Sequence, residues 1–201
     1  MAKKKVGFFG GTFDPIHFGH LNLALQIREQ CGLDEILFSP AQVSPTKQQY
    51  PPHAIAKHRL NMLMLALEGM AQVKIYDQEL FRPPPSYTVD TMQELLKEEK
   101  EAQFYLILGQ DTACSLGQWK GIEELIRLAP PLIGTRFGIK DKNLTGIPEA
   151  ILREVERGVC SIAAMDISAT KIRKRLKNHL YCHHLVPAKV LDYIYQNELY
   201  L

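Results

Sequence analysis

The sequence predicts an α/β protein built on an open, doubly wound parallel sheet with helices on both of its faces. Short apolar runs of β-prone residues alternate about five times with segments of helical periodicity along the 201 residues. The connections between these runs are of helical length, as parallel strands require. Residues 104–108 are all apolar or aromatic, which is typical of a central strand buried on both faces. In such a sheet a ligand binds beyond the carboxyl ends of the strands, where the strand order switches.

The first half of the chain is expected to hold three strands and two helices. β-Branched and aromatic residues mark the strands, and apolar residues three or four positions apart mark the helices. In chain order these elements are a strand at 6–9, a helix that includes 21–27, a strand at 35–38, a helix at 54–68 and a strand at 72–76. In the second helix, Leu60, Met64 and Leu67 fall on one face, which we expect to be buried.

The second half of the chain continues the alternation and ends in helices. A stiff extended loop at 82–87 leads to Thr88, which caps or begins a helix that runs to residue 100. The buried stripe of this helix is expected to be Val89, Met92, Leu95 and Leu96. The later elements are the central strand, a helix start at 109–112, a helix at 122–128, a strand at 131–136, a loop at 138–149, a strand at 161–164, a basic helix at 171–177 capped by 166–170, and a closing helix at 187–199 with Val190, Ile194 and Tyr195 facing inward.

Composition narrows the class of protein. The 24 basic and 22 acidic side chains nearly cancel, which disfavours a dedicated nucleic-acid or membrane-surface protein. The length predicts one domain over 1–201, with a small C-terminal helical part at about 166–201. The cysteines are scattered and form no CxxC pair, so we expect reduced thiols and a cytoplasmic location. They are Cys31, Cys114, Cys160 and Cys182.

A candidate phosphate site lies at residues 10–20, between the first strand and the first helix. Its sequence is Gly-Gly-Thr-Phe-Asp-Pro-Ile-His-Phe-Gly-His. Glycines let the backbone approach a ligand closely, and a helix N-terminus offers free N–H groups and a positive dipole to an anion. His17 and His20 stand where the helix begins and can add hydrogen-bond donors, with positive charge if they are protonated.

Other polar stretches also follow expected strands. The loop at 39–53 is excluded from regular structure by four prolines, and a loop of this length is usually functional. Residues 109–111 follow the central strand, and Arg136 ends the next strand. Since the carboxyl ends of parallel strands meet at one edge, we expect these stretches to share a single site with residues 10–20.

Two motifs carry a resemblance to a known family. Residues 11–20 resemble the HxGH signature of the nucleotidyltransferase superfamily, and residues 167–173 (Ile-Ser-Ala-Thr-Lys-Ile-Arg) resemble its distal ISSTxIR motif. Together with Ser-Tyr-Thr at 86–88, Gly-Gln-Asp at 109–111 and Trp119, the order and spacing are similar to those of bacterial nicotinate-nucleotide adenylyltransferases. The resemblance covers nearly the whole chain and implies a Rossmann-like fold.

The chain departs from that family at two positions. Thr46 stands between Pro45 and Lys47, where the family often has Pro-His-Lys, so one expected phosphate-binding histidine is missing. His53 is a candidate substitute for it. Ala169 stands where the distal motif commonly has serine, which removes one hydroxyl from the expected triphosphate site.

The resemblance implies transfer of AMP from ATP to the 5′-phosphate of nicotinate mononucleotide, a late step of NAD biosynthesis that releases pyrophosphate. The attacking phosphate oxygen is already ionised, so catalysis is positioning and charge neutralisation, without a protein nucleophile. The catalytic residues that this implies are His17, His20 (next to the reacting centre), Lys47 and Arg173. The ATP-binding residues are Gly10, Gly11, Thr12, Phe13, Asp111, Ser168 and Thr170. For Asp111, an N-cap role for the following helix is an equally compatible interpretation.

For the acceptor, the resemblance implies that Trp119 stacks on the nicotinate ring and that Thr88 lies near the carboxylate. It further implies that Arg136 helps to hold the mononucleotide phosphate and that Tyr87 borders the ring. Read without the family, Trp119 is an ordinary half-buried aromatic residue.

Mg²⁺ is expected to arrive with ATP, because the sequence shows no dedicated carboxylate cluster. The late His and Cys residues at 179–184 fit no standard zinc spacing. Two other functions stay open: adenylyl transfer to the amide form of the mononucleotide or to another phosphate acceptor such as phosphopantetheine, and nucleotide binding by a regulator without catalysis. The oligomeric state is not predicted.

Overall fold

A computed structural model describes residues 3–45, 51–135 and 147–201 of the 201-residue chain. In these ranges the strands are β1 (Lys4–Gly11), β2 (Glu35–Pro40), β3 (Val73–Ile75), β4 (Ala102–Gly109), β5 (Pro131–Thr135) and β6 (Val159–Ser161). The α-helices are α1 (Phe18–Cys31), α2 (Ala56–Leu67), α3 (Thr88–Glu98), α4 (Gln110–Ala113), α5 (Ile122–Leu128), α6 (Glu149–Arg157), α7 (Ala169–Lys177) and α8 (Ala188–Gln196). Two short 3-10 helices are η2 (Gln78–Leu80) and η3 (Leu116–Gln118).

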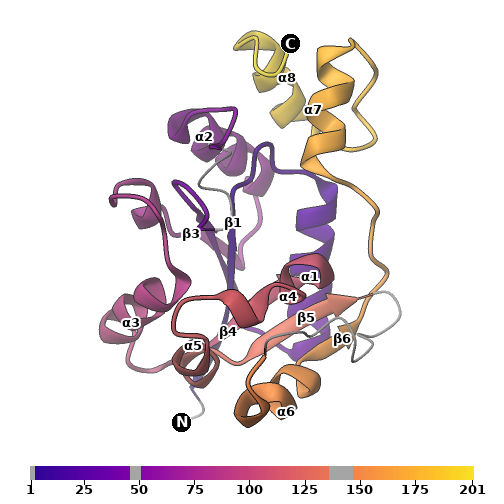
Figure 1. Cartoon of the computed structure of the whole chain (residues 1–201). Coiled ribbons are helices and arrows are strands. Elements are labelled where there is room, and N and C mark those ends of the chain that lie inside the picture. The colour runs from indigo at the N-terminus through magenta and orange to yellow at the C-terminus, as the bar shows by residue number, and fades with distance from the viewer. Residues whose placement is uncertain (1–2, 46–50, 136–146) are drawn as a thin grey trace. The chain divides into compact units, whose positions relative to one another are not determined.

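The predicted sheet is confirmed. Its strand order is β3-β2-β1-β4-β5-β6, with parallel pairing of β1 with β4, of β4 with β5 and of β5 with β6 (Figure 1). Because β1 lies between β2 and β4, the chain winds outward from β1 in both directions, which makes the ends of β1 and β4 the switch point. The signature at 11–20 follows β1 directly, so the fold starts that segment at the edge where ligands bind in such sheets.

The chain forms two compact units, each made of separate segments. The first unit comprises Met1–Gly10, Leu23–Leu37 and Tyr87–Ala164. The second unit comprises Gly11–Asn22, Phe38–Ser86 and Met165–Leu201. The single domain with a helical part at about 166–201 stays a prediction.

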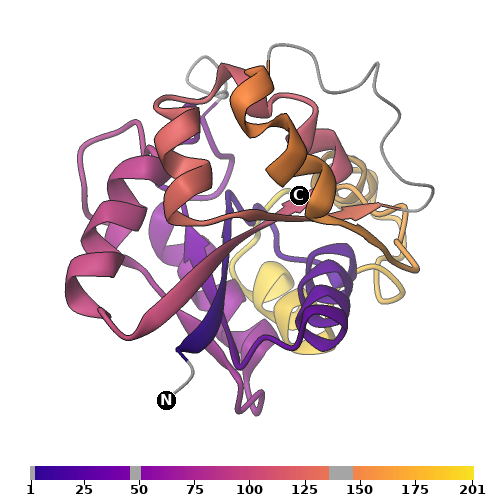
Figure 2. The same ribbon diagram turned by 90° about the horizontal axis from the view of Figure 1, so that it is seen from below.

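The core of the first unit lies around β4. Phe104, Leu106 and Ile107 are buried on its two faces, as the apolar run predicts. Figure 2 shows α5 and α6 on one side of β5 and β6, with α1 on the other. A Cβ on Gly134 of β5 would lie 2.3 Å from Leu23 of α1, so glycine permits this close helix–sheet packing.

The region around β6 differs from the expectation. The strand begins at Val159, two residues earlier than predicted, because Val159 pairs with Ile133 of β5. Ala163 lies beyond the strand, and its backbone exchanges two hydrogen bonds with the Gln26 side chain of α1 instead of with a neighbouring strand. Helix α6 has no counterpart among the predicted elements, because only Ile151 and Val155 carry its buried face.

The second unit holds α2, β3, α7 and α8, and α2 packs against α8 (Figure 1). Two expectations about helix faces are wrong here. Met64 is 56% exposed, while Arg59, Met62, Leu63, Ala66 and Leu67 form the buried face of α2. Tyr195 is 44% exposed, because the buried stripe of α8 is Val190, Leu191 and Ile194.

Three smaller differences concern element ends. β2 continues through Pro40, so the proline-rich loop begins after it. Thr88 is the first residue of α3, with Tyr87 at the N-cap position. Leu96 is only half-buried, and Thr91 completes the buried stripe of α3 instead. No helix in the described ranges is long and apolar enough to cross a membrane.

Candidate active site

The signature turn joins β1 to α1 and places Phe13 inside the second unit. Phe13 is 1% exposed and has a positive φ of 47°, with its ring 5.7 Å from that of Phe38. A Cβ on Gly11 would lie 2.9 Å from the Phe13 ring, so glycine at 11 makes room for this packing. Since the Phe13 side chain is buried, only its backbone remains for the predicted nucleotide contact.

His17 and His20 form a stacked pair at the start of α1. Their ring centroids lie 3.6 Å apart with an interplanar angle of 19°. Burial lowers the pKa of His17 to about 4, so His17 is neutral at neutral pH. Within the described residues, the buried Nδ1 of His17 has no hydrogen-bond partner. A buried polar atom without a partner is costly, so this nitrogen marks a place where a ligand can bind.

The position of Gly19, just before the second histidine, leaves no room for a side chain. A Cβ at residue 19 would lie 3.1 Å from Nδ1 of His17 and 3.3 Å from the Cβ of Ile167. Glycine therefore lets the signature turn and the first residue of the distal motif approach each other closely. Gly19 and Ile167 are 148 residues apart in sequence, yet both belong to the second unit.

Replacing Gly19 with alanine is expected to displace the His17 ring by a few tenths of an ångström or more. We expect about a tenfold fall in kcat/KM, because small displacements of a positioning group are costly to catalysis. Steady-state kinetics measure this change. Ala164→Gly is the control, because residue 164 belongs to neither motif and is no predicted site residue, and we expect wild-type values from it. Wild-type kcat/KM in Gly19→Ala would show that this close approach does not matter.

Arg173 joins the distal motif to the signature turn. Nη1 of Arg173 donates to the carbonyl oxygen of Asp14 at 2.6 Å, and Nη2 donates to Oγ1 of Thr170 at 3.3 Å. Ser168 occupies the N-cap position of α7 without a side-chain capping bond, so its hydroxyl is not used for the helix. The distal motif thus offers a guanidinium at Asp14 and hydroxyls at the start of α7, groups of the kind that bind a polyphosphate.

Asp14 lies within the signature, and no role was predicted for it from the sequence. Its carboxylate is 5% exposed and accepts hydrogen bonds from the backbone N–H groups of His53 at 2.8 Å and Ala54 at 3.1 Å. It also accepts one from the Tyr200 hydroxyl at 2.6 Å. The exposed His53 ring has Nδ1 3.5 Å from Asp14, so His53 does adjoin the signature turn, and its role as the substitute histidine stays a prediction.

The sequence did not predict a role for Arg59, because a charged residue on an amphipathic helix is normally exposed to solvent. It is 1% exposed and donates to four backbone carbonyls. These are the carbonyls of Thr12 at 2.8 Å, Ala41 at 2.6 Å, Gln42 at 3.1 Å and Ala54 at 3.2 Å. Burial lowers the pKa of Arg59, and the nearby Asp14 carboxylate opposes this shift. Arg59 therefore ties the signature turn to the segments before and at the start of α2.

The predicted acceptor residues belong to the first unit. Trp119 is half-buried directly after η3, and its Nε1 has no hydrogen-bond partner within the described part of the chain. Nζ of Lys120 lies 4.4 Å from the centroid of the Tyr87 ring, and it also donates to Asp90 of α3 at 3.0 Å. The segment that carries Trp119 is thereby held against the start of α3, where Tyr87 and Thr88 lie. Lys120 is therefore a cation beside Tyr87 for which the sequence predicted no role.

The other predicted residues have separate outcomes. Asp111 is exposed in the first turn of the short helix α4, and Gly109 holds the N-cap position, so the N-cap interpretation of Asp111 is wrong. Lys47 and Arg136 lie outside the described residues. Gly10 ends the part of β1 that belongs to the first unit, and Thr12 offers its carbonyl to Arg59.

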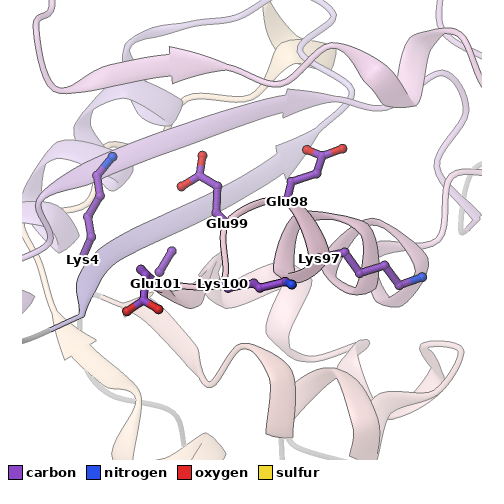
Figure 3. A pocket seen from close by; sticks show the side chains of 7 residues that line it. Lys4, Lys97, Glu98, Glu99, Lys100 and Glu101 are labelled. Carbon is purple, nitrogen blue, oxygen red and sulfur yellow. The ribbon is translucent and has the colours of Figure 1, made fainter.

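The described ranges contain no group of three or more side chains suited to a resident metal ion. A hollow of about 540 Å³ lies at the opposite, amino end of β1 and β4 (Figure 3). It is lined by Lys4, Lys97, Glu98, Glu99, Lys100, Glu101 and Ala102. Three lysines and three glutamates offer no net positive charge, so this hollow does not suit a polyphosphate.

Comparisons with known proteins agree with this geometry. The family model described as cytidylyltransferase-like matches residues 8–175. A Methylacidiphilum infernorum protein named "Probable nicotinate-nucleotide adenylyltransferase" is 36% identical, over 100% of this chain and 96% of the relative. A Bacillus mycoides protein of the same name is 38% identical, over 98% of both chains. The solved structure of Plasmodium falciparum nicotinic acid mononucleotide adenylyltransferase complexed with NaAD has a TM-score of 0.77 at 22% identity, over 98% of this chain and 97% of that one.

Proposed function

Because the chain belongs to the cytidylyltransferase-like family, and within it to the nicotinate-nucleotide adenylyltransferases, we propose that it transfers AMP from ATP to nicotinate mononucleotide. The products are nicotinate adenine dinucleotide and pyrophosphate, which makes the reaction a late step of NAD biosynthesis. The observation that carries the proposal is the meeting of the two motifs, in which Arg173 of the distal motif reaches the turn that bears the stacked histidines.

The chemistry requires groups that hold and neutralise phosphates. A phosphate oxygen of the mononucleotide attacks the α-phosphorus of ATP, a new P–O bond forms, and the bond to the β-phosphate breaks as pyrophosphate leaves. The attacking oxygen is already ionised, so the protein needs no nucleophile of its own. His20 at the helix N-terminus donates to the oxygens around the α-phosphorus, where negative charge concentrates in the transition state.

The remaining residues of the second unit hold the rest of the triphosphate. His17 supplies a neutral donor from beneath His20. Arg173 uses one N–H on Asp14 and one on Thr170, which leaves further N–H groups of its five for phosphate oxygens. Ser168 adds its unused hydroxyl and Lys47 keeps its predicted role as a phosphate clamp. Mg²⁺ enters as part of the MgATP substrate, bound mainly by the phosphates themselves.

The acceptor is assigned to the first unit. Trp119 provides a flat face for the pyridine ring, and its Nε1 is free to donate within the described residues. Thr88 and Tyr87 at the start of α3 lie on the segment held by Lys120, which suits a carboxylate. Arg136 keeps its predicted role at the mononucleotide phosphate, and Asp111 its role at the ATP ribose. The cytoplasmic location also stays a prediction.

The test is to follow pyrophosphate release from Mg-ATP with each acceptor in turn. We expect release with nicotinate mononucleotide at a rate at least about tenfold above that with the amide form, since a carboxylate and an amide need different partners. Phosphopantetheine is expected to give none. Equal rates with acid and amide would contradict the selectivity, and an absence of release with any acceptor would favour the non-catalytic regulator.

A further inference from the structure

The last residues of the chain return to the signature turn. Helix α8 ends at Gln196, and beyond it Glu198 and Tyr200 have positive φ values of 51° and 64°. Left-handed backbone at non-glycine residues persists only where the surroundings compensate for it. The compensating contact here is the hydrogen bond from the Tyr200 hydroxyl to Oδ1 of Asp14, at 2.6 Å. Short hydrogen bonds from a hydroxyl to a carboxylate are among the stronger ones in proteins.

Asp14 joins three parts of the second unit. Its carboxylate accepts from the backbone of His53 and Ala54, its carbonyl oxygen accepts from Arg173, and its Oδ1 accepts from Tyr200. Nη1 of Arg173 lies 3.9 Å from Oδ2 of the same carboxylate, which is beyond a hydrogen bond but close enough for an ion pair. The guanidinium therefore has two possible partners: the carboxylate that it nearly touches and a phosphate.

We infer that Tyr200 is a positioning residue of the ATP site: its hydroxyl engages the Asp14 carboxylate and so leaves Arg173 available to the triphosphate. This inference rests on the proposed function, because it takes Arg173 as a phosphate ligand. Without the hydroxyl, Asp14 loses one of its donors, and its carboxylate turns to Arg173 for a replacement. An Arg173 guanidinium neutralised by Asp14 attracts phosphate less strongly. The affinity for ATP is therefore expected to fall, while the affinity for the acceptor stays the same.

Arg59 does not replace Tyr200 as a hydrogen-bond donor to Asp14. Its side chain donates to four backbone carbonyls, so its donors are committed elsewhere, although its charge acts on Asp14 through space. His53 contributes its backbone N–H, while its ring is exposed to solvent. Among the groups that face Asp14 in the described part of the chain, Tyr200 is the neutral side-chain donor in direct hydrogen-bond contact.

The test is calorimetric titration of Tyr200→Phe with a non-hydrolysable ATP analogue and Mg²⁺, together with steady-state kinetics. We expect about a tenfold rise in the dissociation constant and in KM for ATP, the typical effect of losing a hydrogen bond to a charged group. KM for the mononucleotide is expected to change little, and the lost hydrogen bond is expected to lower the unfolding midpoint without unfolding the protein under assay conditions. Tyr195→Phe is the matched control, because this tyrosine is exposed on α8, and we expect wild-type values.

A second substitution separates positioning from a purely structural role. In an Asp14→Asn background no carboxylate competes for Arg173, so adding Tyr200→Phe is expected to have less than a twofold effect on ATP binding. An undiminished tenfold effect in that background would overturn the inference.

Arg173→Ala separates this inference from the proposed function. If it leaves ATP affinity unchanged, the proposed triphosphate site is wrong and the role of Tyr200 is wrong with it. If Arg173→Ala weakens ATP binding while Tyr200→Phe does not, the triphosphate site stands and the positioning role alone is overturned.

Discussion

His20→Ala is expected to lower turnover by about 10²-fold or more, the typical effect of removing one preorganised donor from a developing charge. The His20 ring stacks on His17 at 3.6 Å and meets the edge of the Phe13 ring at 5.2 Å, so its position is fixed before substrate arrives. It also stands in the first turn of α1, where the helix dipole favours negative charge. The measurement is kcat with both substrates saturating.

The control is His184→Ala, because His184 is exposed and belongs to neither motif. We expect wild-type turnover from it. Circular dichroism and the urea midpoint of His20→Ala are expected to match wild type within a small margin, since the His20 side chain is only half-buried. An unchanged rate in His20→Ala would show that the reacting centre lies elsewhere.

Arg59→Leu is expected to reduce the free energy of unfolding by about 3 kcal/mol or more. The substitution leaves four carbonyls of the turn and its neighbouring segments without their donor, and it removes a cation that interacts with the buried Asp14 carboxylate. Removing one partner from a buried, charged network typically costs about 3–5 kcal/mol. Urea unfolding at neutral pH, followed by circular dichroism, measures the change.

Lys57→Leu is the matched control on the same helix, because Lys57 is exposed, and we expect its stability to stay within about 0.5 kcal/mol of wild type. Arg59→Lys keeps the charge but not the fork of donors, so we expect it to recover only part of the loss. Wild-type stability in Arg59→Leu would contradict the structural role of this side chain.

Local sequence signals predicted the parts of the fold that are set locally. The apolar run at 104–108 became the central strand β4, because a strand that pairs on both sides and is covered on both faces needs apolar residues throughout. Gly11 and Gly19 marked the signature turn, since close approach of other groups leaves no space for a side chain there. The meeting of the two motifs was foreseeable from the family resemblance and not from spacing.

Tertiary contacts account for what the sequence did not predict. The charge of Arg59 suggested a solvated face, yet the carbonyls that surround it are brought together only by folding. Tyr200 stands next to the chain end, where no local pattern indicates a partner 186 residues away. Helix α6 exposes most of its nine residues, so Ile151 and Val155 alone gave too weak a period to recognise.

The most direct test of the reaction is to identify the product made from Mg-ATP and nicotinate mononucleotide. Mass spectrometry of the dinucleotide and an independent assay of pyrophosphate, run on the same sample, measure both halves of the transfer. We predict nicotinate adenine dinucleotide and pyrophosphate in equal amounts, with neither formed when the mononucleotide is omitted. Pyrophosphate without the dinucleotide, or no turnover of ATP at all, would contradict adenylyl transfer by this chain.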